Sequence, residues 1–331
     1  MSGSGRRRFA DLTIEWDRGD LALDPFGPIL PLEVERPPAS DHETPADIVI
    51  EGRAVSQATP SPAEHGAEPV LYHGSTQCFR RGQELILWDR ASTLTIGGDG
   101  QHILAHVHAS SIEQPFHFSS VTVMMAVLLA LRSHGYFHLH AAGARWSDGQ
   151  TWLVPGESSS GKSTLALSLF AAGASWLSDD ALLLRPEREG VEAVGWARPI
   201  RMTTATAAAF PHLQPMLVRC AAGSDRDYEV DPREAFSGRA LVAGGPPLTL
   251  VFPRIAGEPH TRVSELDRAE AFGRILHACA WVASEHLPGR AQQLELLGRL
   301  VDTARAFDVA VGSRVLTEPD AVVEVIRQRI G

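Results

Sequence analysis

The chain has 331 residues, of which 44% are hydrophobic and 21% charged, and its formal net charge at pH 7 is −10. This is the composition of a globular protein with a full-sized core, and it excludes a wholly disordered or fibrous chain. The acidic balance argues against a nucleic-acid partner, which would need a basic surface for its phosphates. The cysteines, Cys78, Cys220 and Cys279, are too few for a disulfide framework, and no apolar run is long enough to span a membrane. We therefore expect a cytoplasmic protein with no membrane partner.

The basic residues are divided unusually between arginine and lysine. Lys and Arg together number 30, and Lys162 is the only lysine. Arginine serves as well as lysine for solubility and surface pairing, so the retained lysine marks a position where a planar guanidinium does not serve. Lys162 is therefore the first candidate for a specific chemical role.

The first 118 residues predict a small, mostly β unit. Residues 12–16 alternate as a strand does, and strand-like segments return over 70–109, where we expect antiparallel pairing. Between them, about 36–69 is rich in Pro, Ala, Ser and Glu, with one apolar island at Ile48–Ile50. That composition predicts an exposed, partly flexible connection.

A connecting helix is expected over 119–136, and residues 137–331 predict an α/β domain. The strands expected in this domain are 138–146, 151–154 and 248–252, and the helices are 264–287 with Ser264 as N-cap, 289–307 and 320–330.

The segment after the strand expected at 151–154 fits the phosphate-binding loop pattern, in which two glycines separated by four residues precede Lys and Ser. Glycine permits the turns that let successive N–H groups converge on phosphate oxygens, and a helix beginning near Lys162 points its positive end at the same anion. The Lys162 ammonium group reaches the β and γ phosphates, and the Ser163 hydroxyl is placed to ligate Mg²⁺. The residues expected to bind ATP are Gly156, Glu157, Ser158, Ser159, Ser160, Gly161, Lys162, Ser163 and Thr164.

Two adjacent carboxylates, Asp179 and Asp180, end the apolar run that begins at Trp176. A carboxylate at a strand end beside a phosphate loop is the usual second anchor for Mg²⁺, and another can accept the proton of an attacking hydroxyl. An Asp-Asp turn on the surface is the alternative, but the short distance from Lys162 and the apolar flanks favour a site. Spacing does not decide which carboxylate has which role.

His138 and His140 share one face of the strand expected at 138–146, so a metal pair is conceivable. No Cys or further His is spaced to complete a zinc site, and each histidine alone is more typical of a packed core residue.

Together, His140-Ala141-Ala142-Gly143, the loop 156–164, Gly173 and Ser178-Asp179-Asp180 resemble the catalytic core of HPr kinase/phosphorylase and its stand-alone bacterial relatives. The specific match covers residues 138–184. The resemblance implies an α/β fold with a P-loop kinase core of the HPr kinase/PEP carboxykinase-like type, using ATP and Mg²⁺. Relatives of this type phosphorylate a serine of a small carrier protein or of a ribosomal peptide precursor such as a lasso peptide.

The same resemblance implies roles for individual residues. Asp179 corresponds to the general base that takes the proton of the substrate serine, with His140 beside it and Lys162 on the phosphates. Asp180 and Ser163 correspond to Mg²⁺ ligands. The roles of the two aspartates can be exchanged without changing the match.

The chain departs from the family after residue 184, where the Glu-Val-Arg-Gly-Leu-Gly-type signature that supplies a further metal carboxylate is missing. Glu187, Glu189 and Glu192 are the candidate substitutes, although their setting indicates an exposed turn. The reverse, phosphorylase reaction is therefore not expected. Residues 1–118 match no part of HPr kinases, so HPr itself is not the expected substrate.

Three arginines, Arg198, Arg201 and Arg254, follow the motif region and are candidates for a further phosphate or substrate contact. Because arginine is so frequent in this chain, a solvated surface position is the favoured interpretation for each of them.

The leading function is an ATP-dependent serine kinase acting on a peptide or small protein. The sequence does not decide whether the chain forms a homo-oligomer. The alternative is a P-loop ATPase or nucleotide-sensing switch without phosphotransfer to protein. The chain lacks the Leu-Ser-Gly-Gly-Gln-type signature of a transport ATPase.

Overall fold

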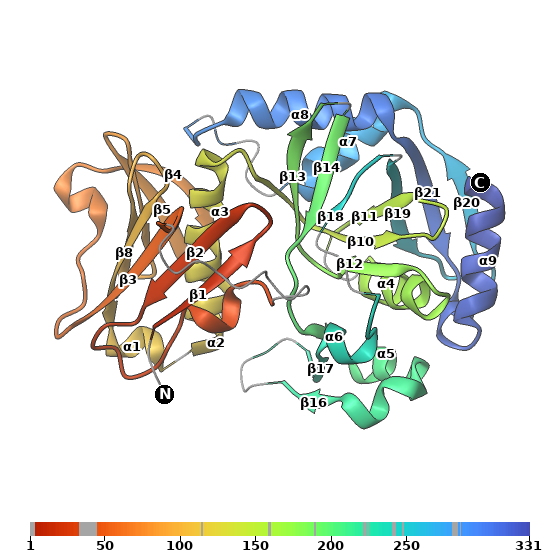
Figure 1. Ribbon diagram of the computed structural model, residues 1–331, viewed down its shortest axis with the longest axis horizontal. Helices are drawn as coiled ribbons and strands as arrows, with labels where there is room; N and C mark the ends of the chain where they lie inside the picture. The colour runs from red at the N-terminus through yellow and green to blue at the C-terminus, as the bar shows by residue number, and fades with distance from the viewer. Residues whose placement is uncertain are drawn as a thin grey trace. The chain divides into compact units, whose positions relative to one another are not determined.

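A computed structural model describes residues 4–32, 45–113, 115–157, 160–188, 190–220, 224, 226–239, 243–246, 248–279, 284 and 286–331. It shows a mixed α/β protein with several sheets (Figure 1). The chain divides into two compact units, the first formed by residues 1–137, 221–224 and 283–290 and the second by residues 138–220, 225–282 and 291–331.

The first unit contains an eight-stranded sheet with the order β1-β2-β3-β8-β7-β6-β5-β4 (Figure 1). In chain order the strands are β1 (Ser4–Phe9), β2 (Leu12–Asp17), β3 (Ile48–Val55), β4 (Glu68–His73), β5 (Thr76–Arg81), β6 (Glu84–Trp88), β7 (Thr93–Ile96) and β8 (His102–His108). β3 runs parallel to both β2 and β8, and the other pairs are antiparallel. The strands over 70–109, where antiparallel pairing is expected, do pair antiparallel with one another, and β3 precedes that range.

The segment 36–69 is not a single exposed connection. Its described part contains β3, which lies inside the sheet with Ile48 and Ile50 completely buried. The apolar island is short, and nothing near it in the sequence shows that it lies inside a sheet. Its partner β8 comes much later in the chain, with Val49 opposite His102. Composition over a short window does not reveal such a pairing. Residues 36–44 lie outside the described part of the chain.

The helices of the first unit are α1 (Ala109–Ile112), α2 (Pro115–His117), a π-helical segment (Phe118–Val123) and α3 (Met124–Ser133), with 3-10 turns at Gly27–Ile29 and Pro62–His65. α3 packs on β7 and β8 and is buried from Met124 to Arg132. It occupies the range expected for a connecting helix but belongs to the first unit. In the described part of the chain no helix combines the length and apolar character that a membrane crossing requires.

The second unit is built on a six-stranded sheet with the order β12-β10-β11-β19-β21-β20. Its strands are β10 (Ala141–Arg145), β11 (Thr151–Pro155), β12 (Ser175–Ser178), β19 (Leu248–Ile255), β20 (Arg262–Glu265) and β21 (Arg305–Val311). β11, β19 and β21 are parallel to one another, whereas β10, β12 and β20 pair antiparallel. Four helices accompany the sheet: α4 (Lys162–Ala171), α7 (Arg268–Ala278), α8 (Arg290–Thr303) and α9 (Pro319–Ile330). α4 packs against β10, β11 and α9, and α7 packs against β21.

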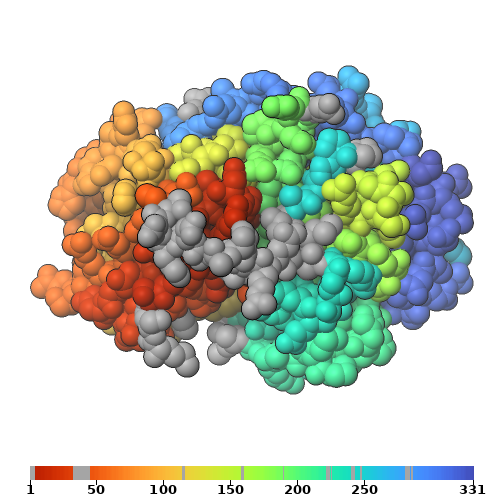
Figure 2. Space-filling view, in the orientation of Figure 1, coloured from red at the N-terminus to blue at the C-terminus, as the bar shows by residue number. Residues whose placement is uncertain are grey.

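Two smaller sheets complete the second unit. One has the order β18-β14-β13-β9, with β9 (Phe137–Leu139), β13 (Leu182–Glu187), β14 (Gly190–Gly195) and β18 (Ala243–Gly244). The other has the order β15-β17-β16, with β15 (Ile200–Met202), β16 (Val218–Arg219) and β17 (Tyr228–Val230), and it is accompanied by α5 (Thr204–Ala209), a 3-10 helix (Pro211–Met216) and α6 (Pro232–Ala235). Residues 200–220 and 226–235, green to teal in Figure 2, gather on one side of the second unit.

The structure corrects two helix predictions near the C-terminal end. Residues 262–265 form β20 instead of starting a helix, so the N-cap of α7 is Asp267, whose side chain accepts from the N–H of Glu270 at 2.8 Å. The helix expected over 289–307 ends at Thr303, and Arg305–Val311 forms the inner strand β21. Six of the seven β21 residues are buried, and a fully buried strand has no period that distinguishes it from a helix.

Gly195, at the end of β14, packs directly against the chain that leads to the carboxylates. A Cβ atom on Gly195 would lie 2.2 Å from the carbonyl oxygen of Leu177, which no side chain tolerates. We expect Gly195→Ala to lower the free energy of unfolding by about 2 kcal/mol or more, measured by urea denaturation. Gly257→Ala is the matched control, because nothing lies within 4 Å of its Cβ position. Equal stability of the two variants would contradict this explanation.

Candidate functional site

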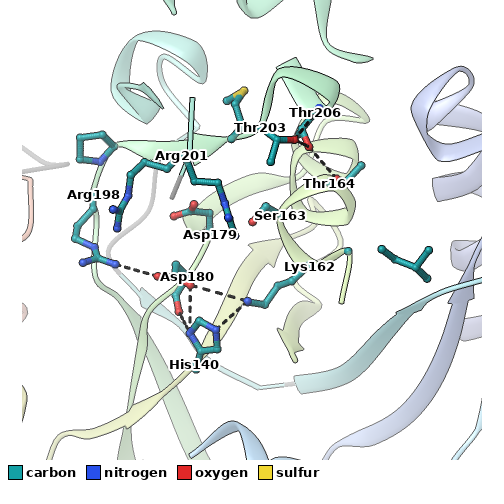
Figure 3. Close-up of a pocket in the computed structure, with 15 residues that line it drawn as sticks. His140, Lys162, Ser163, Thr164, Asp179, Asp180, Arg198, Arg201, Thr203 and Thr206 are labelled. Carbon is teal, nitrogen blue, oxygen red and sulfur yellow. Dashed lines mark hydrogen bonds and ion pairs between the residues drawn. The ribbon is translucent and has the colours of Figure 1, made fainter. Parts of the chain in front are cut away.

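A cavity of about 390 Å³ lies at the N-terminus of α4 (Figure 3). Its walls come from the β9–β10 junction, the start of α4, the end of β12 and the connection from β14 to α5. The lining residues are His140, Gly161, Lys162, Ser163, Thr164, Asp179, Asp180, Arg198, Pro199, Arg201, Met202, Thr203, Thr206, Arg226 and Ile255. Segments far apart in the sequence therefore meet at one place.

The turn into α4 contains a glycine in a conformation that other residues rarely adopt. Gly161 precedes the helix with φ +94°, a left-handed conformation that favours glycine. The first bond of the helix runs from the N–H of Leu165 to the carbonyl of Gly161 at 2.9 Å. The N–H groups of the preceding residues therefore have no acceptor within the helix, and the positive end of the helix dipole faces the cavity.

The loop residues expected to bind ATP separate into groups in the structure. Gly161, Lys162, Ser163 and Thr164 line the cavity at α4. Gly156, Glu157 and Ser160 line a second, adjoining cavity. Ser158 and Ser159 lie outside the described residues.

His140 reaches the first cavity because the expected strand 138–146 is broken at this residue. β9 ends at Leu139 in one sheet and β10 begins at Ala141 in another. The N–H of His140 bonds to the carbonyl of Ala278 at 3.0 Å, which fixes the break. His138, on β9, is not among the described residues that line the cavity.

His140, Lys162 and Asp180 form a connected polar network (Figure 3). Nδ1 of His140 lies 3.1 Å from the carbonyl oxygen of Asp180 and 3.2 Å from its Oδ1, and both partners can only accept. Nδ1 therefore carries the proton, and Nε2 accepts from Nζ of Lys162 at 3.0 Å. Burial lowers the pKa of His140, consistent with a neutral ring between the lysine and the carboxylate.

Arg198 is part of the site, which corrects the surface position expected for it. Its side chain is only 13% exposed, and Nη2 bonds to Oδ2 of Asp180 at 3.0 Å. Arg201 and Arg226 also line the cavity, and Arg226 had no signal in the sequence. Arg198 reaches Asp180 because the β13–β14 hairpin pairs Leu182 with Gly195 and so returns the chain to the end of β12.

The two adjacent aspartates experience opposite environments. Asp179 is buried, and desolvation together with the neighbouring Asp180 raises its pKa to about 7. For Asp180 burial also acts upward, but Arg198, His140 and Lys162 outweigh it and hold the pKa well below its usual range. Asp180 is therefore ionised at neutral pH, and Asp179 is poised to gain or lose a proton there.

Several other candidates lie elsewhere. Glu187 is exposed at the end of β13, and Glu192 pairs with Arg185 at 2.5 Å, so neither lines the cavity. Glu189 lies outside the described residues. Arg254 pairs with Asp308 at 3.0 Å and lines the second cavity.

The donor set in the cavity suits a hard cation more than zinc. Among the described residues no three His, Cys, Asp or Glu side chains form a metal cluster. Ser163, Asp179 and Asp180 nevertheless bring oxygen donors to one cavity, and Mg²⁺ binds through one or two carboxylates together with phosphate oxygens and water. These residues fit Mg²⁺ bound with a polyphosphate.

A scan against protein-family models finds no match, and neither does a search of curated proteins. Among solved structures, the chain is similar to the HPr(Ser) kinase/phosphatase from Coxiella burnetii, at 12% sequence identity and a TM-score of 0.32. That alignment covers 58% of this chain and 91% of the other. A likeness at this score establishes neither family nor function, so function has to be inferred from the site of this chain.

The raised pKa of Asp179 has a consequence for stability. Between about pH 4 and pH 7 the folded protein holds the Asp179 proton more tightly than the unfolded chain, so ionisation of this group destabilises the fold as pH rises. In metal-free buffer we expect Asp179→Asn to be increasingly more stable than the parent across this range, by about 1 kcal/mol or more at pH 7. Urea denaturation at a series of pH values measures the difference.

Asp302→Asn is the matched control, because it removes an aspartate whose side chain is 66% exposed. A stability difference for Asp179→Asn that does not change with pH would contradict the raised pKa.

Proposed function

We propose that the chain is a P-loop kinase that transfers the γ-phosphoryl group of ATP to a serine of a peptide or small protein. The observation that carries the proposal is the meeting of Lys162, Asp179 and Asp180 in one cavity at the N-terminus of α4. A helix N-terminus with a lysine suits phosphate, and the carboxylates add a metal ligand and a base.

Charge supports a polyphosphate as the occupant. Among the described residues, four cationic side chains, Lys162, Arg198, Arg201 and Arg226, line the cavity together with two carboxylates. Free N–H groups at the start of α4 add positive potential. In this proposal Lys162 and the loop amides hold the β and γ phosphates, where they stabilise the charge that spreads over the transferring group.

Asp179 is the proposed general base. The serine oxygen forms a bond to the γ phosphorus, the bond from that phosphorus to the bridging oxygen of ADP breaks, and the serine proton moves to the Asp179 carboxylate. A base that titrates near neutral pH serves this step well. Asp180 is the less suitable base because its oxygens already accept from Arg198 and His140.

Asp180 and Ser163 are the proposed Mg²⁺ ligands. Metal ligands must be deprotonated, and the cations around Asp180 keep it ionised. Bound with the nucleotide, Mg²⁺ would neutralise charge on the β and γ phosphates. The neutral ring of His140 keeps Lys162 and Asp180 in their relative positions before the nucleotide enters.

The choice of a serine in a peptide or small protein comes from the motif resemblance of residues 138–184 alone. It is therefore tested directly, by offering labelled ATP to pools of candidate peptides and small proteins and identifying the phosphorylated residue. Rapid ATP hydrolysis without an acceptor would instead favour the ATPase or nucleotide-sensing switch.

Two substitutions separate binding from transfer. We expect Lys162→Ala to lower phosphotransfer by about 100-fold or more, because the compact charge on the phosphates is lost. Asp179→Asn should lower transfer by about 100-fold while leaving ATP affinity within about threefold, because it removes only the base. Transfer of label and calorimetric ATP binding measure the two quantities.

Lys162→Arg keeps the charge and tests whether the loop needs the ammonium group itself, and we expect it to lose transfer as well. Arg262→Ala is the control, since its side chain is 67% exposed on β20. Phosphotransfer that survives in Asp179→Asn would rule out Asp179 as the base.

A further inference from the structure

One wall of the first cavity comes from the chain between β14 and α5. Six lining residues belong to this stretch or to the first turns of α5: Arg198, Pro199, Arg201, Met202, Thr203 and Thr206. The proposed phosphotransfer assigns none of them a contact with the acceptor.

Arg201 lines this wall from an anchored backbone. It is the middle residue of β15, and its neighbours Ile200 and Met202 are almost completely buried. β15 pairs antiparallel with β17, and the N–H of Asp227 bonds to the carbonyl of Met202 at 3.2 Å. Glu229, opposite Arg201 on β17, is not among the described residues that line the cavity. The position of Arg201 in the cavity wall is therefore fixed by the small sheet behind it.

Arg201 lies next to the proposed base. Asp179 lies between Arg201 and Lys162 (Figure 3). Burial and Asp180 raise the pKa of Asp179, and the charges of Arg198 and Arg201 act against this rise, so both arginines are close to its carboxyl group. Arg198 is bonded to Asp180 at 3.0 Å. Arg201 is therefore the second cation of this wall.

The acceptor has to approach Asp179 from the side of this wall. Its hydroxyl must lie within hydrogen-bond distance of the base, while the nucleotide phosphates occupy the start of α4. Thr203 lines the cavity and is exposed, so the part formed by β15 and α5 is open to solvent. Consecutive Cα atoms are about 3.8 Å apart, so the residues next to an acceptor serine on Asp179 pass close to Arg201.

A carboxylate is the group that suits this position. A guanidinium carries five N–H donors in a planar fork, so an arginine can hold a carboxylate in addition to its other contacts. When Asp179 takes the serine proton, the negative charge next to Arg201 disappears, and an acidic group of the acceptor can replace it. A basic residue at the same place would be repelled by Arg198 and Arg201.

We infer that the acceptor is an acidic peptide segment, in which Arg201 binds an Asp or Glu side chain within two residues of the phosphorylated serine. The inference rests on the proposed function, because it presupposes an acceptor serine at Asp179. It makes Arg201 a residue that determines which serines are phosphorylated.

Acetylated and amidated peptides, whose blocked ends carry no terminal carboxylate, test the inference on the full chain. Each contains one serine among alanines, with Glu, Gln or Lys at one of the two positions on either side of it. With labelled ATP, we expect kcat/KM for the best Glu peptide to be about tenfold above that of its Gln counterpart, with the Lys peptide lower still. The difference should lie in KM, because the contact is the same before and during transfer.

Arg201→Gln should make the Glu and Gln peptides equal, whatever the change in overall rate. Arg201→Glu should reverse the preference in favour of the Lys peptide, an outcome that a merely misfolded variant cannot give. Arg226→Gln is the matched control, because it removes another arginine of the cavity and should keep the preference. Burial and the charge of Arg226 both lower the pKa of Lys162, so this arginine lies on the side of the phosphates.

Equal kcat/KM for the Glu and Gln peptides with the parent protein would overturn the acidic acceptor while the proposed function stands. A preference that survives in Arg201→Gln, or that is lost in Arg226→Gln as well, would equally overturn the role of Arg201. Phosphorylation of no peptide at all would overturn the proposed function and the acidic acceptor together.

Discussion

The ammonium group of Lys162 is removed from water, and the second unit has to compensate for that cost. Lys162 is only 6% exposed, and an unpaired charge in such a buried position would be strongly destabilising. Compensation comes from His140 at 3.0 Å and Asp180 at 3.9 Å, which belong to other segments of the chain. The β9–β10 junction, the end of β12 and the start of α4 must therefore meet at one point. The break between β9 and β10 at His140 and the close packing of Gly195 against Leu177 both help to bring these segments together.

The adjacent carboxylates show how one short segment can supply two chemistries. Asp179 is buried in the cavity wall, where desolvation and the adjacent Asp180 disfavour its charge, while Asp180 contacts Arg198, His140 and Lys162, which favour its charge. Neighbouring groups whose pKa values are driven apart are suited to the separate tasks of accepting a proton and holding a cation. The fold tolerates the cost of burying the Asp179 carboxyl because the hydrogen bonds and ion pairs of the adjacent Asp180 stabilise the same segment.

Local motifs in the sequence singled out residues that the structure brings together, and the roles assigned to them stay predictions. The glycine-flanked lysine and the Asp-Asp pair depend on neighbours within a few residues, and Lys162, Ser163, Asp179, Asp180 and His140 do line one cavity. The position of Arg198 was missed because it depends on the β13–β14 hairpin, in which Leu182 pairs with Gly195 and the residues after β14 return to Asp180. β3 was missed because its apolar island is short and stands in a Pro- and Ala-rich segment. β21 was missed because six of its seven residues are buried, which leaves no period to distinguish a strand from a helix. Arg226 comes from a segment in which nothing local distinguishes it from the other arginines.

The parallel strands of the six-stranded sheet also bear on how the protein folds. β11, which leads into the loop, pairs with β19 so that Leu153 lies opposite Leu250, and β19 in turn pairs with β21, with Leu250 opposite Ala306. Such pairings have to close long stretches of chain before they gain any contact, which slows folding. During synthesis β11 and α4 leave the ribosome well before β19 and β21 exist. During that interval Lys162 has no completed sheet beside it, and the apolar side of β11 can contact other unfolded chains.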